Sequence, residues 1–267
     1  MANGKLSEYL EAAKEAARRA AVVLGDWRQR FTVREKARFD LVTEADLASQ
    51  KTIQDYLCGL FPDHDFLGEE DKTARAKPGP DAPPTWIVDP IDGTTNYGHD
   101  CPLYCISIGL QVAGDLVVGV VYDPCRQEMF AAATGQGAWL NQRRLQTSAA
   151  DRLEEALLST GFPPDMHGQE RILDWWRYFS LRTRSLRRTG STALNMAYVA
   201  AGRFDGYWAF DNHVWDVAGA TVLVREAGGM LTNTDGSDYD PYTPDALVSN
   251  GPLHPVLLEA MRQGGRE

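Results

Sequence analysis

The chain has 267 residues, 43% of them hydrophobic and 24% charged, which is the balance of a folded globular protein and not of a disordered chain. Its formal net charge of −10 opposes the phosphate backbone of nucleic acids and argues against general nucleic-acid binding. No apolar run is long enough to cross a bilayer, and the N-terminal segment mixes Glu with Lys and Arg, so we expect no signal peptide, no membrane association and a cytoplasmic location.

The first half of the chain begins with helical patterns and continues with strand-like ones. Apolar residues at helical spacing predict a helix over 6–24, and a second helix follows Thr43 and ends near Pro62. Four prolines within 71–84 predict a loop. The apolar run Trp86–Val88 predicts a buried strand, and an antiparallel meander is predicted after it from the segments 104–112, 116–122 and 128–132.

In the second half, strand-like and helical patterns alternate, which predicts a layered α/β arrangement. We find no internal repeat and no linker, so we expect two halves of one compact unit, 1–150 and 151–267. The predicted strands are 156–160, 185–188, 205–210 and segments near 230 and 247, and the predicted helices are 168–180, 191–201, 216–227 and one after Pro252.

Acidic side chains are concentrated in four short segments. The richest is Asp89-Pro-Ile-Asp92-Gly-Thr-Thr-Asn, directly after the predicted strand Trp86–Val88. An unpaired carboxylate at the end of a buried strand is costly to desolvate, and Asp89, the Ile91 carbonyl and Asp92 are oxygen ligands of the kind that Mg²⁺ and Mn²⁺ prefer. The Gly-Thr-Thr turn offers N–H groups and hydroxyls to a phosphate. The other three segments are Asp40-Leu-Val-Thr-Glu-Ala-Asp46, Gly68-Glu-Glu70 and Trp215-Asp-Val-Ala-Gly219.

The string WIVDPIDGTTNY, with DLVTEAD and GEE before it and WDVAGA after it, closely resembles the inositol monophosphatase family. This family belongs to the lithium-sensitive, metal-dependent phosphatases, together with fructose-1,6-bisphosphatases and bisphosphate nucleotidases. The resemblance runs from Asp40 to about Leu231. It implies an α/β (α+β) fold, a layered αβαβα sandwich of the sugar-phosphatase type, with two or three Mg²⁺ ions per site, Mn²⁺ as a possible substitute, and a homodimer.

The resemblance also implies a role for each matching residue. Glu69, Asp89 and the Ile91 carbonyl match ligands of a first metal, and Asp89, Asp92 and Asp216 match ligands of a second. Glu69 would help to hold a weaker third ion through water. Asp46 and Thr94 match the pair that orients and deprotonates the attacking water. Glu69 is also expected to take part in catalysis. The residues implied in substrate binding are Asp92, Gly93, Thr94, Gly190, Ser191, Thr192 and Asp211.

Ala209 departs from the family pattern, because inositol-phosphate enzymes carry a ring-binding glutamate there, seven residues before the metal-binding Asp216. Alanine cannot bind ring hydroxyls, and Asp211 could substitute. The leading function is therefore a Mg²⁺-dependent phosphomonoesterase for a small phosphorylated metabolite, inositol-1-phosphate-like, that uses in-line attack by water. The alternatives are a histidinol phosphatase, a bisphosphatase or nucleotidase, and a regulatory or scaffolding protein on the same fold.

Several of these residues also have purely structural interpretations. Thr43-Glu-Ala-Asp46 has the form of a helix capping box, Glu69 and Glu70 fit a solvated turn, and Asp216 fits a helix N-terminal charge. His213 fits a structural histidine or a support of the metal site. A basic run fits a solvated face, a subunit contact or a second substrate phosphate: Arg182, Arg184, Arg187 and Arg188.

Overall fold

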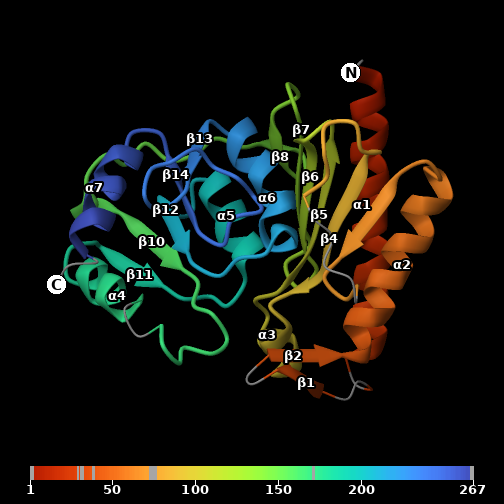
Figure 1. Cartoon of the computed structure of the whole chain (residues 1–267), viewed down its shortest axis with the longest axis horizontal. Coiled ribbons are helices and arrows are strands. Elements are labelled where there is room, and N and C mark those ends of the chain that lie inside the picture. Colours follow the sequence, from red (N-terminus) through yellow and green to blue (C-terminus); the bar gives the residue numbers. More distant parts are fainter. Residues whose placement is uncertain are drawn as a thin grey trace.

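Helices and sheets alternate in layers across the computed structural model (Figure 1). It describes residues 3–28, 30, 33–37, 40–71, 77–169 and 172–264, with the backbone only for Asn3, 33–37 and 40–43. An outer helical layer packs on a seven-stranded sheet, a central helical pair separates this sheet from a five-stranded one, and a third helical layer covers the far side. The three layers of helices are α1 (Asn3–Trp27) with α2 (Glu44–Leu60), α5 (Thr192–Ala200) with α6 (Val214–Glu226), and α4 (Ile172–Ser180) with α7 (His254–Gly264).

The seven-stranded sheet confirms the predicted meander. Its strands lie in chain order, and only the β3–β4 pair is parallel. In order they are β3 (Asp65–Gly68), β4 (Thr85–Asp92), β5 (Cys105–Val112), β6 (Asp115–Asp123), β7 (Glu128–Ala133), β8 (Ala138–Leu140) and β9 (Arg143–Arg144).

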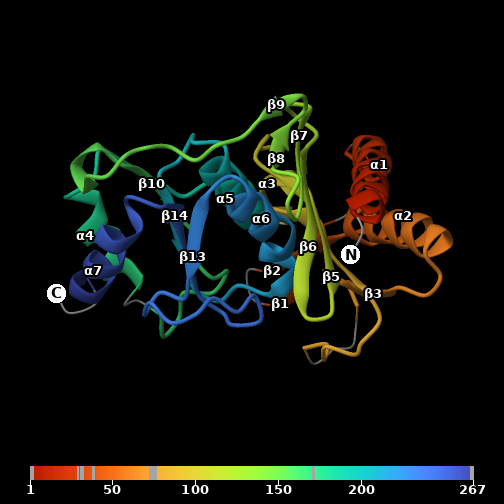
Figure 2. The ribbon, with the colours of Figure 1, turned by 90° about the horizontal axis from the view of Figure 1, so that it is seen from above.

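The five-stranded sheet is mixed. β10 lies between β11 and β12 and is parallel to both, whereas β14 is antiparallel to β12 and β13. The segment after β9 crosses from one sheet to the other (Figure 2). In spatial order the strands are β11 (Ser185–Arg187), β10 (Leu157–Thr160), β12 (Gly206–Ala209), β14 (Ala246–Asn250) and β13 (Gly229–Thr232).

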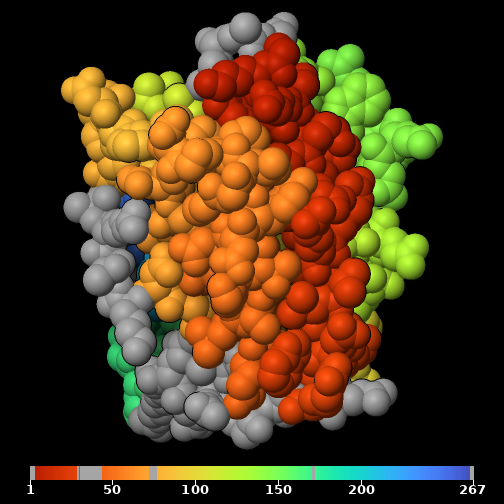
Figure 3. Space-filling view, turned by 90° about the vertical axis from the view of Figure 1, so that its right-hand side faces the viewer, coloured from red at the N-terminus to blue at the C-terminus, as the bar shows by residue number. Residues whose placement is uncertain are grey.

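The layers enclose three hydrophobic cores. One lies between the seven-stranded sheet and α1–α2, where Ala13, Ala16, Ala17 and Ala20 are fully buried, so that α1 lies close to the sheet. The second surrounds α5 and α6 between the two sheets, and the third lies under α4 and α7. Figure 3 shows α1 and α2 covering the outer face. The predicted layered αβαβα architecture is therefore confirmed.

The close approach of α6 to the seven-stranded sheet requires glycine. A Cβ added to Gly219 would lie 2.7 Å from the Val120 carbonyl oxygen, and one added to Gly119 would lie 2.0 Å from the Gly219 carbonyl oxygen. Such distances cannot be tolerated without backbone movement. The glycine of the WDVAGA segment thus fixes the depth of the helix that carries Asp216.

Some short elements were not expected from the sequence. They are the hairpin of β1 (Val33–Ala37) and β2 (Asp40–Thr43), the short strands β3, β8 and β9, helix α3 (Thr94–Gly98) and the 3₁₀ turn η1 (Leu153–Glu155). The expected helix 168–180 is described as α4 from Ile172, and 170–171 lie outside the described residues. Of the expected loop 71–84, residues 72–76 also lie outside them. Within the described ranges, no helix combines the length and apolar character needed to span a membrane.

Candidate active site

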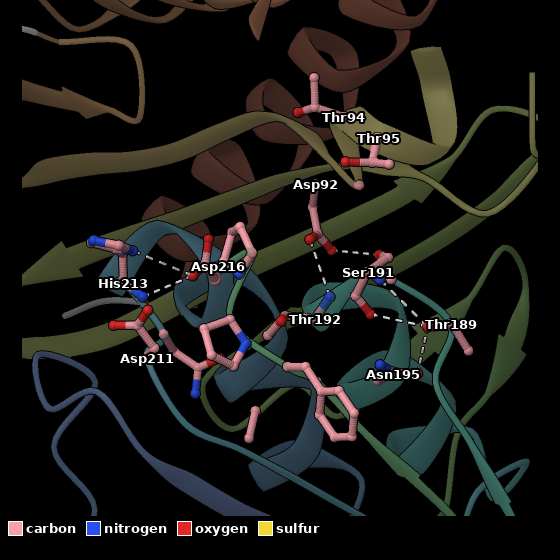
Figure 4. A pocket seen from close by; sticks show the side chains of 18 of the residues that line it. Asp92, Thr94, Thr95, Thr189, Ser191, Thr192, Asn195, Asp211, His213 and Asp216 are labelled. Atoms are coloured by element: carbon pink, nitrogen blue, oxygen red, sulfur yellow. Dashed lines mark hydrogen bonds and ion pairs between the residues drawn. The ribbon is translucent and has the colours of Figure 1, made fainter. Parts of the chain in front are cut away.

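A pocket of about 650 Å³ lies where the ends of β4 and β12 meet the first turns of α5 and α6 (Figure 4). Nine of the twelve residues to which the sequence assigned metal, catalytic or substrate roles line it. The remaining ones, Asp46, Asp89 and Ile91, are buried against β4 behind the lining. The lining members are Glu69, Asp92, Gly93, Thr94, Gly190, Ser191, Thr192, Asp211 and Asp216.

Among the carboxylates of Glu69, Asp89, Asp92 and Asp216, that of Asp89 is the most deeply buried. It is 2% exposed on β4, and its Oδ1 accepts a hydrogen bond from the Ile91 N–H at 3.0 Å. Burial raises the pKa of Asp89 well above its usual range, and the negative charges of Glu69, Asp92 and Asp216 raise it further. A cation among these groups would remove the repulsion that disfavours their ionised forms.

Thr94 lies between Asp46 and the main chain of β4. Its Oγ1 is 3.2 Å from Asp46 Oδ1 and 3.0 Å from the Ile91 carbonyl oxygen, and its one hydrogen can be donated to only one of them at a time. Asp46 is completely buried in the first turn of α2. Whether Thr43 completes a capping box with this turn lies outside the described side chains.

Asp92 is held by the first turn of α5. Its carboxylate accepts hydrogen bonds from the Ser191 hydroxyl, the Thr192 N–H at 3.1 Å and the Ala193 N–H at 2.7 Å, and the Cys105 Sγ lies 3.5 Å from Oδ2. Burial raises the pKa of Asp92 to about 6, although these donors oppose the shift. The side chain therefore already has good hydrogen-bond partners in the absence of a metal.

Asp216 lies at the start of α6. Its Oδ2 accepts a hydrogen bond from the His213 N–H at 2.7 Å, which caps the helix, so the helix-start interpretation of Asp216 is correct (Figure 4). The same side chain lines the pocket, and burial raises its pKa well above the usual range. The His213 imidazole stacks on Trp215 with ring centres 4.8 Å apart.

The group of carboxylates fits a hard divalent cation by its chemistry. Glu69 follows β3, where its N–H donates to the Val88 carbonyl at 3.0 Å, and it supplies a further oxygen donor beside Asp89. Carboxylate and carbonyl oxygens are the ligands that Mg²⁺ prefers. The cage is not closed, however: across the part of the chain that is described, no three His, Cys, Asp or Glu side chains are arranged to hold a metal as they stand. A metal would therefore require some adjustment of these side chains.

On the substrate side, two glycines approach each other across the pocket. Gly93 has φ +100°, and a Cβ there would lie 3.2 Å from the Gly190 carbonyl oxygen, so the turn after Asp92 needs glycine. The Thr192 Oγ1 lies 3.0 Å from the Tyr207 hydroxyl. Ala209 lines the pocket as a small apolar group, and the exposed Asp211 has φ +65° beside it.

Sequence reasoning missed several lining residues. Asn96 belongs to the DPIDGTTN string but received no role; its Nδ2 donates to the carbonyls of Leu103 at 2.7 Å and Thr189 at 2.8 Å, which ties α3 to the segment before α5. Asn195 on α5 carried no signal. Of the arginine run, only Arg188 lines the pocket, a position that charge patterning cannot distinguish.

The comparisons with known proteins agree with this geometry. The family model "Inositol monophosphatase family" matches residues 5–266. An inositol-1-monophosphatase of Synechocystis is 41% identical over 262 residues, covering 96% of this chain and 89% of the relative. The Nus factor SuhB of Pseudomonas aeruginosa is 42% identical over 210 residues, covering 78% of this chain and 77% of the relative.

One solved structure has a fold very similar to that of this chain. The extragenic suppressor protein suhB from Bartonella henselae has a TM-score of 0.88 at 35% identity, covering 98% of this chain and 100% of that one. The family match spans nearly the whole chain, and the fold and the acidic pocket are consistent with it. The chain belongs to the inositol monophosphatase family, whose enzymes are phosphoric monoester hydrolases and are generally metal dependent.

Proposed function

We propose that this protein is a Mg²⁺-dependent phosphomonoesterase that hydrolyses a small phosphorylated metabolite, inositol-1-phosphate-like, by in-line attack of water. The observation that carries the proposal is the convergence of Glu69 after β3, Asp89 and Asp92 on β4, and Asp216 on α6, beside the Thr94–Asp46 pair. Carboxylates repel a phosphate monoester unless cations lie between them.

Glu69, Asp89 and the Ile91 carbonyl would hold one Mg²⁺, and Asp89, Asp92 and Asp216 would hold another. Glu69 would share a third, weaker ion through water, and Mn²⁺ could substitute for Mg²⁺. When bound, such ions lower the pKa of water and neutralise charge on the attacking and leaving oxygens. The high pKa values of Asp89 and Asp216 support this assignment, because charge compensation is what these carboxylates lack.

The protein's own part in the reaction is to orient the water and take its proton. When the Thr94 hydroxyl donates to Asp46, the lone pairs of Thr94 Oγ1 are free to accept a proton from the attacking water. Asp46, fully buried, receives the hydroxyl proton in turn. The water oxygen forms a bond to phosphorus opposite the leaving oxygen, the P–O ester bond breaks, and the departing alkoxide is protonated from solvent to give an alcohol and inorganic phosphate.

The remaining lining residues would contact the phosphate and the alcohol portion of the substrate. The backbone N–H groups of Gly93 and Thr94 would contact the phosphate, and Gly190, Ser191 and Thr192 would approach the alcohol portion. With Ala209 in place of a ring-binding glutamate, Asp211 is the acidic group left to bind a hydroxyl or an amine on this side. We therefore keep histidinol phosphate and bisphosphates as alternative substrates.

Phosphate release by the purified protein tests the proposal. We expect turnover with Mg²⁺, none with a chelator, and recovery when Mg²⁺ is restored, across inositol 1-phosphate, histidinol phosphate and adenosine bisphosphate. The matched variant is Asp46→Asn, which offers an amide oxygen as acceptor for the Thr94 hydroxyl but cannot take its proton, so we expect it to bind Mg²⁺ and release no phosphate. Turnover that is unchanged by the chelator would refute the metal assignment.

A second candidate is a regulatory or scaffolding role, because a relative at 42% identity carries the name Nus factor. The presence of every matching acidic residue, from Asp46 to Asp216, favours the enzyme. A folded protein that binds Mg²⁺ and releases phosphate from none of the substrates would favour the regulatory role.

The family resemblance supports three further properties. We expect a cytoplasmic homodimer without general nucleic-acid binding, inhibited by lithium at concentrations where sodium has no effect. Light scattering after size exclusion measures the mass of the dimer against 29.6 kDa for one chain. Phosphate release in LiCl against NaCl measures the lithium effect.

A further inference from the structure

Two side chains that line the pocket carry hydrogen-bond donors for which the described residues supply no acceptor. They are Arg188 and Asn195, and neither belongs to the set of residues that would hold the metals or the reacting phosphate. The carboxylates of Glu69, Asp92 and Asp216 line the same pocket. The pocket therefore combines acceptors for cations with donors that can bind an anion.

Arg188 is an exposed cation without an anionic partner in the described part of the chain. Its guanidinium carbon lies 5.0 Å from the ring centre of Phe162, another lining residue, so the aromatic ring supports the planar head group. The neighbouring arginines are used differently: Arg182 stacks on Tyr178, and Arg187 donates to Ser185 and to the Leu186 carbonyl.

Asn195 is 1% exposed, and half of its amide is satisfied. Its Oδ1 accepts a hydrogen bond from the Thr189 hydroxyl at 2.8 Å, whereas its Nδ2 has no hydrogen-bond partner among the described residues (Figure 4). A buried donor without a partner is costly, and natural proteins retain few of them. A donor of this kind in a pocket wall is satisfied when a ligand supplies an acceptor.

The segment between these two residues is firmly held. The Thr189 carbonyl accepts from Asn96 Nδ2 at 2.8 Å, and the same amide donates to the Leu103 carbonyl at 2.7 Å. Thr189 thus connects the backbone next to Arg188 with the side chain of Asn195. These hydrogen bonds fix the backbone beside Arg188 and the side chain of Asn195, which reduces the entropic cost of binding a ligand.

We propose that Arg188 and Asn195 form a subsite for a second anionic group, a phosphate or a carboxylate, carried by the substrate in addition to the phosphate that is hydrolysed. The inference rests on the proposed function and narrows its substrate class to small metabolites with two anionic groups. A guanidinium binds either anion through paired N–H groups, and the Asn195 amide adds a donor that a singly charged substrate leaves unused.

Two substrate pairs test the subsite. Fructose 1,6-bisphosphate against fructose 1-phosphate isolates a second phosphate, and 2-phosphoglycerate against glycerol 2-phosphate isolates a carboxylate. The protein variants are Arg188→Gln and Asn195→Asp, the latter keeping an acceptor for Thr189. Arg184→Gln is the matched control, because Arg184 is an exposed arginine of the same run outside the pocket.

We expect the wild-type protein to have a lower KM for the doubly charged member of at least one pair. Arg188→Gln should raise that KM by about 10- to 100-fold, the range for a lost charge-assisted hydrogen bond, with kcat and the KM of the singly charged member nearly unchanged. Asn195→Asp should act in the same direction, and Arg184→Gln should have no effect. The pair that responds identifies the anion.

Equal KM values within both pairs, or equal losses in Arg188→Gln and Arg184→Gln, would overturn the subsite while leaving the phosphatase intact. Calorimetric binding of the same compounds to Asp46→Asn protein with Mg²⁺ provides a readout that does not need turnover. If no compound is hydrolysed by the wild type, the proposed function fails. The subsite is then decided by whether Arg188→Gln weakens binding of the doubly charged compounds alone.

Discussion

Among single residues, Asp92 connects distant parts of the chain most directly. Its carboxylate accepts hydrogen bonds from Ser191, Thr192 and Ala193, which lie 99 to 101 residues later. If Asp92 binds Mg²⁺ as we propose, these donors orient its carboxylate and favour the anionic form that a metal needs, while further lone pairs stay available to the metal. The position of the first turn of α5 thus determines where this ligand points.

Replacing Asp89 with Asn should separate the metal site from the fold. Asn keeps the acceptor that the Ile91 N–H uses at 3.0 Å, but removes a carboxylate that is buried beside Glu69, Asp92 and Asp216. We expect turnover to vanish and calorimetric Mg²⁺ binding to weaken. The thermal midpoint without metal should stay the same or rise, because a repelling buried charge is gone. Normal turnover in this variant would disprove the ligand assignment.

His254 should make stability depend on pH. It is 1% exposed at the start of α7, with Nδ1 2.7 Å from the Ser249 hydroxyl and Nε2 3.1 Å from the Thr232 hydroxyl, and burial lowers its pKa below the usual 6.5. Between the unfolded and the folded pKa, the unfolded chain binds a proton that the folded chain does not. The free energy of unfolding should therefore fall as pH drops below 6.5, by at most about 1.4 kcal/mol per pH unit.

Comparison with a variant isolates this contribution from the other titrating groups. In His254→Gln, urea unfolding between pH 7.5 and 5 should give a free energy that falls less steeply than in the wild type. Parallel curves for the two proteins would show that His254 takes up its proton equally in both states, and the prediction would be wrong.

At the scale of elements, α6 controls the site through its contact with the sheet. In Gly219→Ala the new methyl would lie 2.7 Å from the Val120 carbonyl oxygen and 2.8 Å from Ser107 Oγ, so the helix must move outward. We expect a loss of about 1–3 kcal/mol of unfolding free energy, as for overpacked cores. Mg²⁺ affinity should also fall, because Asp216 moves with the helix.

Gly59→Ala is the control for this substitution. Gly59 also lies within a helix, α2, but a Cβ there meets nothing within 4 Å, so alanine should be neutral or stabilise the helix by up to about 1 kcal/mol. Chemical unfolding and Mg²⁺ calorimetry on both variants make the comparison. Equal changes in the free energy of unfolding of the two variants would show that the close contact of Gly219 with the sheet carries no cost, and the prediction would be wrong.

The elements also show how far the sequence alone could reach. Helices α1 and α2 and the meander follow from residue periodicity, which is a local property. The short strands β3, β8 and β9 were missed, because segments of two to four residues form only through pairing with a neighbour already in place. Residues of the acidic motifs, Glu69, Asp92 and Asp216, line one pocket, and the roles assigned to them stay predictions. The arginine run suggested a second substrate phosphate as one of three interpretations, but the sequence could not single out Arg188 or point to Asn195, because their placement depends on contacts through Thr189 and Asn96.

For the whole molecule, the central layer joins the two sheets into one structure. The core around α5 and α6 contains residues of both proposed halves, 1–150 and 151–267, including Phe130 and Ala132 from one sheet and Tyr207 and Val248 from the other. Asp92 and Asp216 likewise come from different halves and line the same pocket. Neither half can bury its inner face alone, so the halves should fold and bind metal together.

Equilibrium urea unfolding tests this cooperation. Trp86 belongs to the first half and Trp208 to the second, and both are fully or almost fully buried, so fluorescence follows both halves while circular dichroism follows the helices. We expect a single transition that coincides for the two signals. Mg²⁺ at about 100 times its dissociation constant should stabilise the whole molecule by about 2.7 kcal/mol in the wild type and much less in Asp216→Asn. Two separate transitions, or a Mg²⁺ effect on only one signal, would show that the halves are independent domains and that the pocket lies between parts that unfold separately.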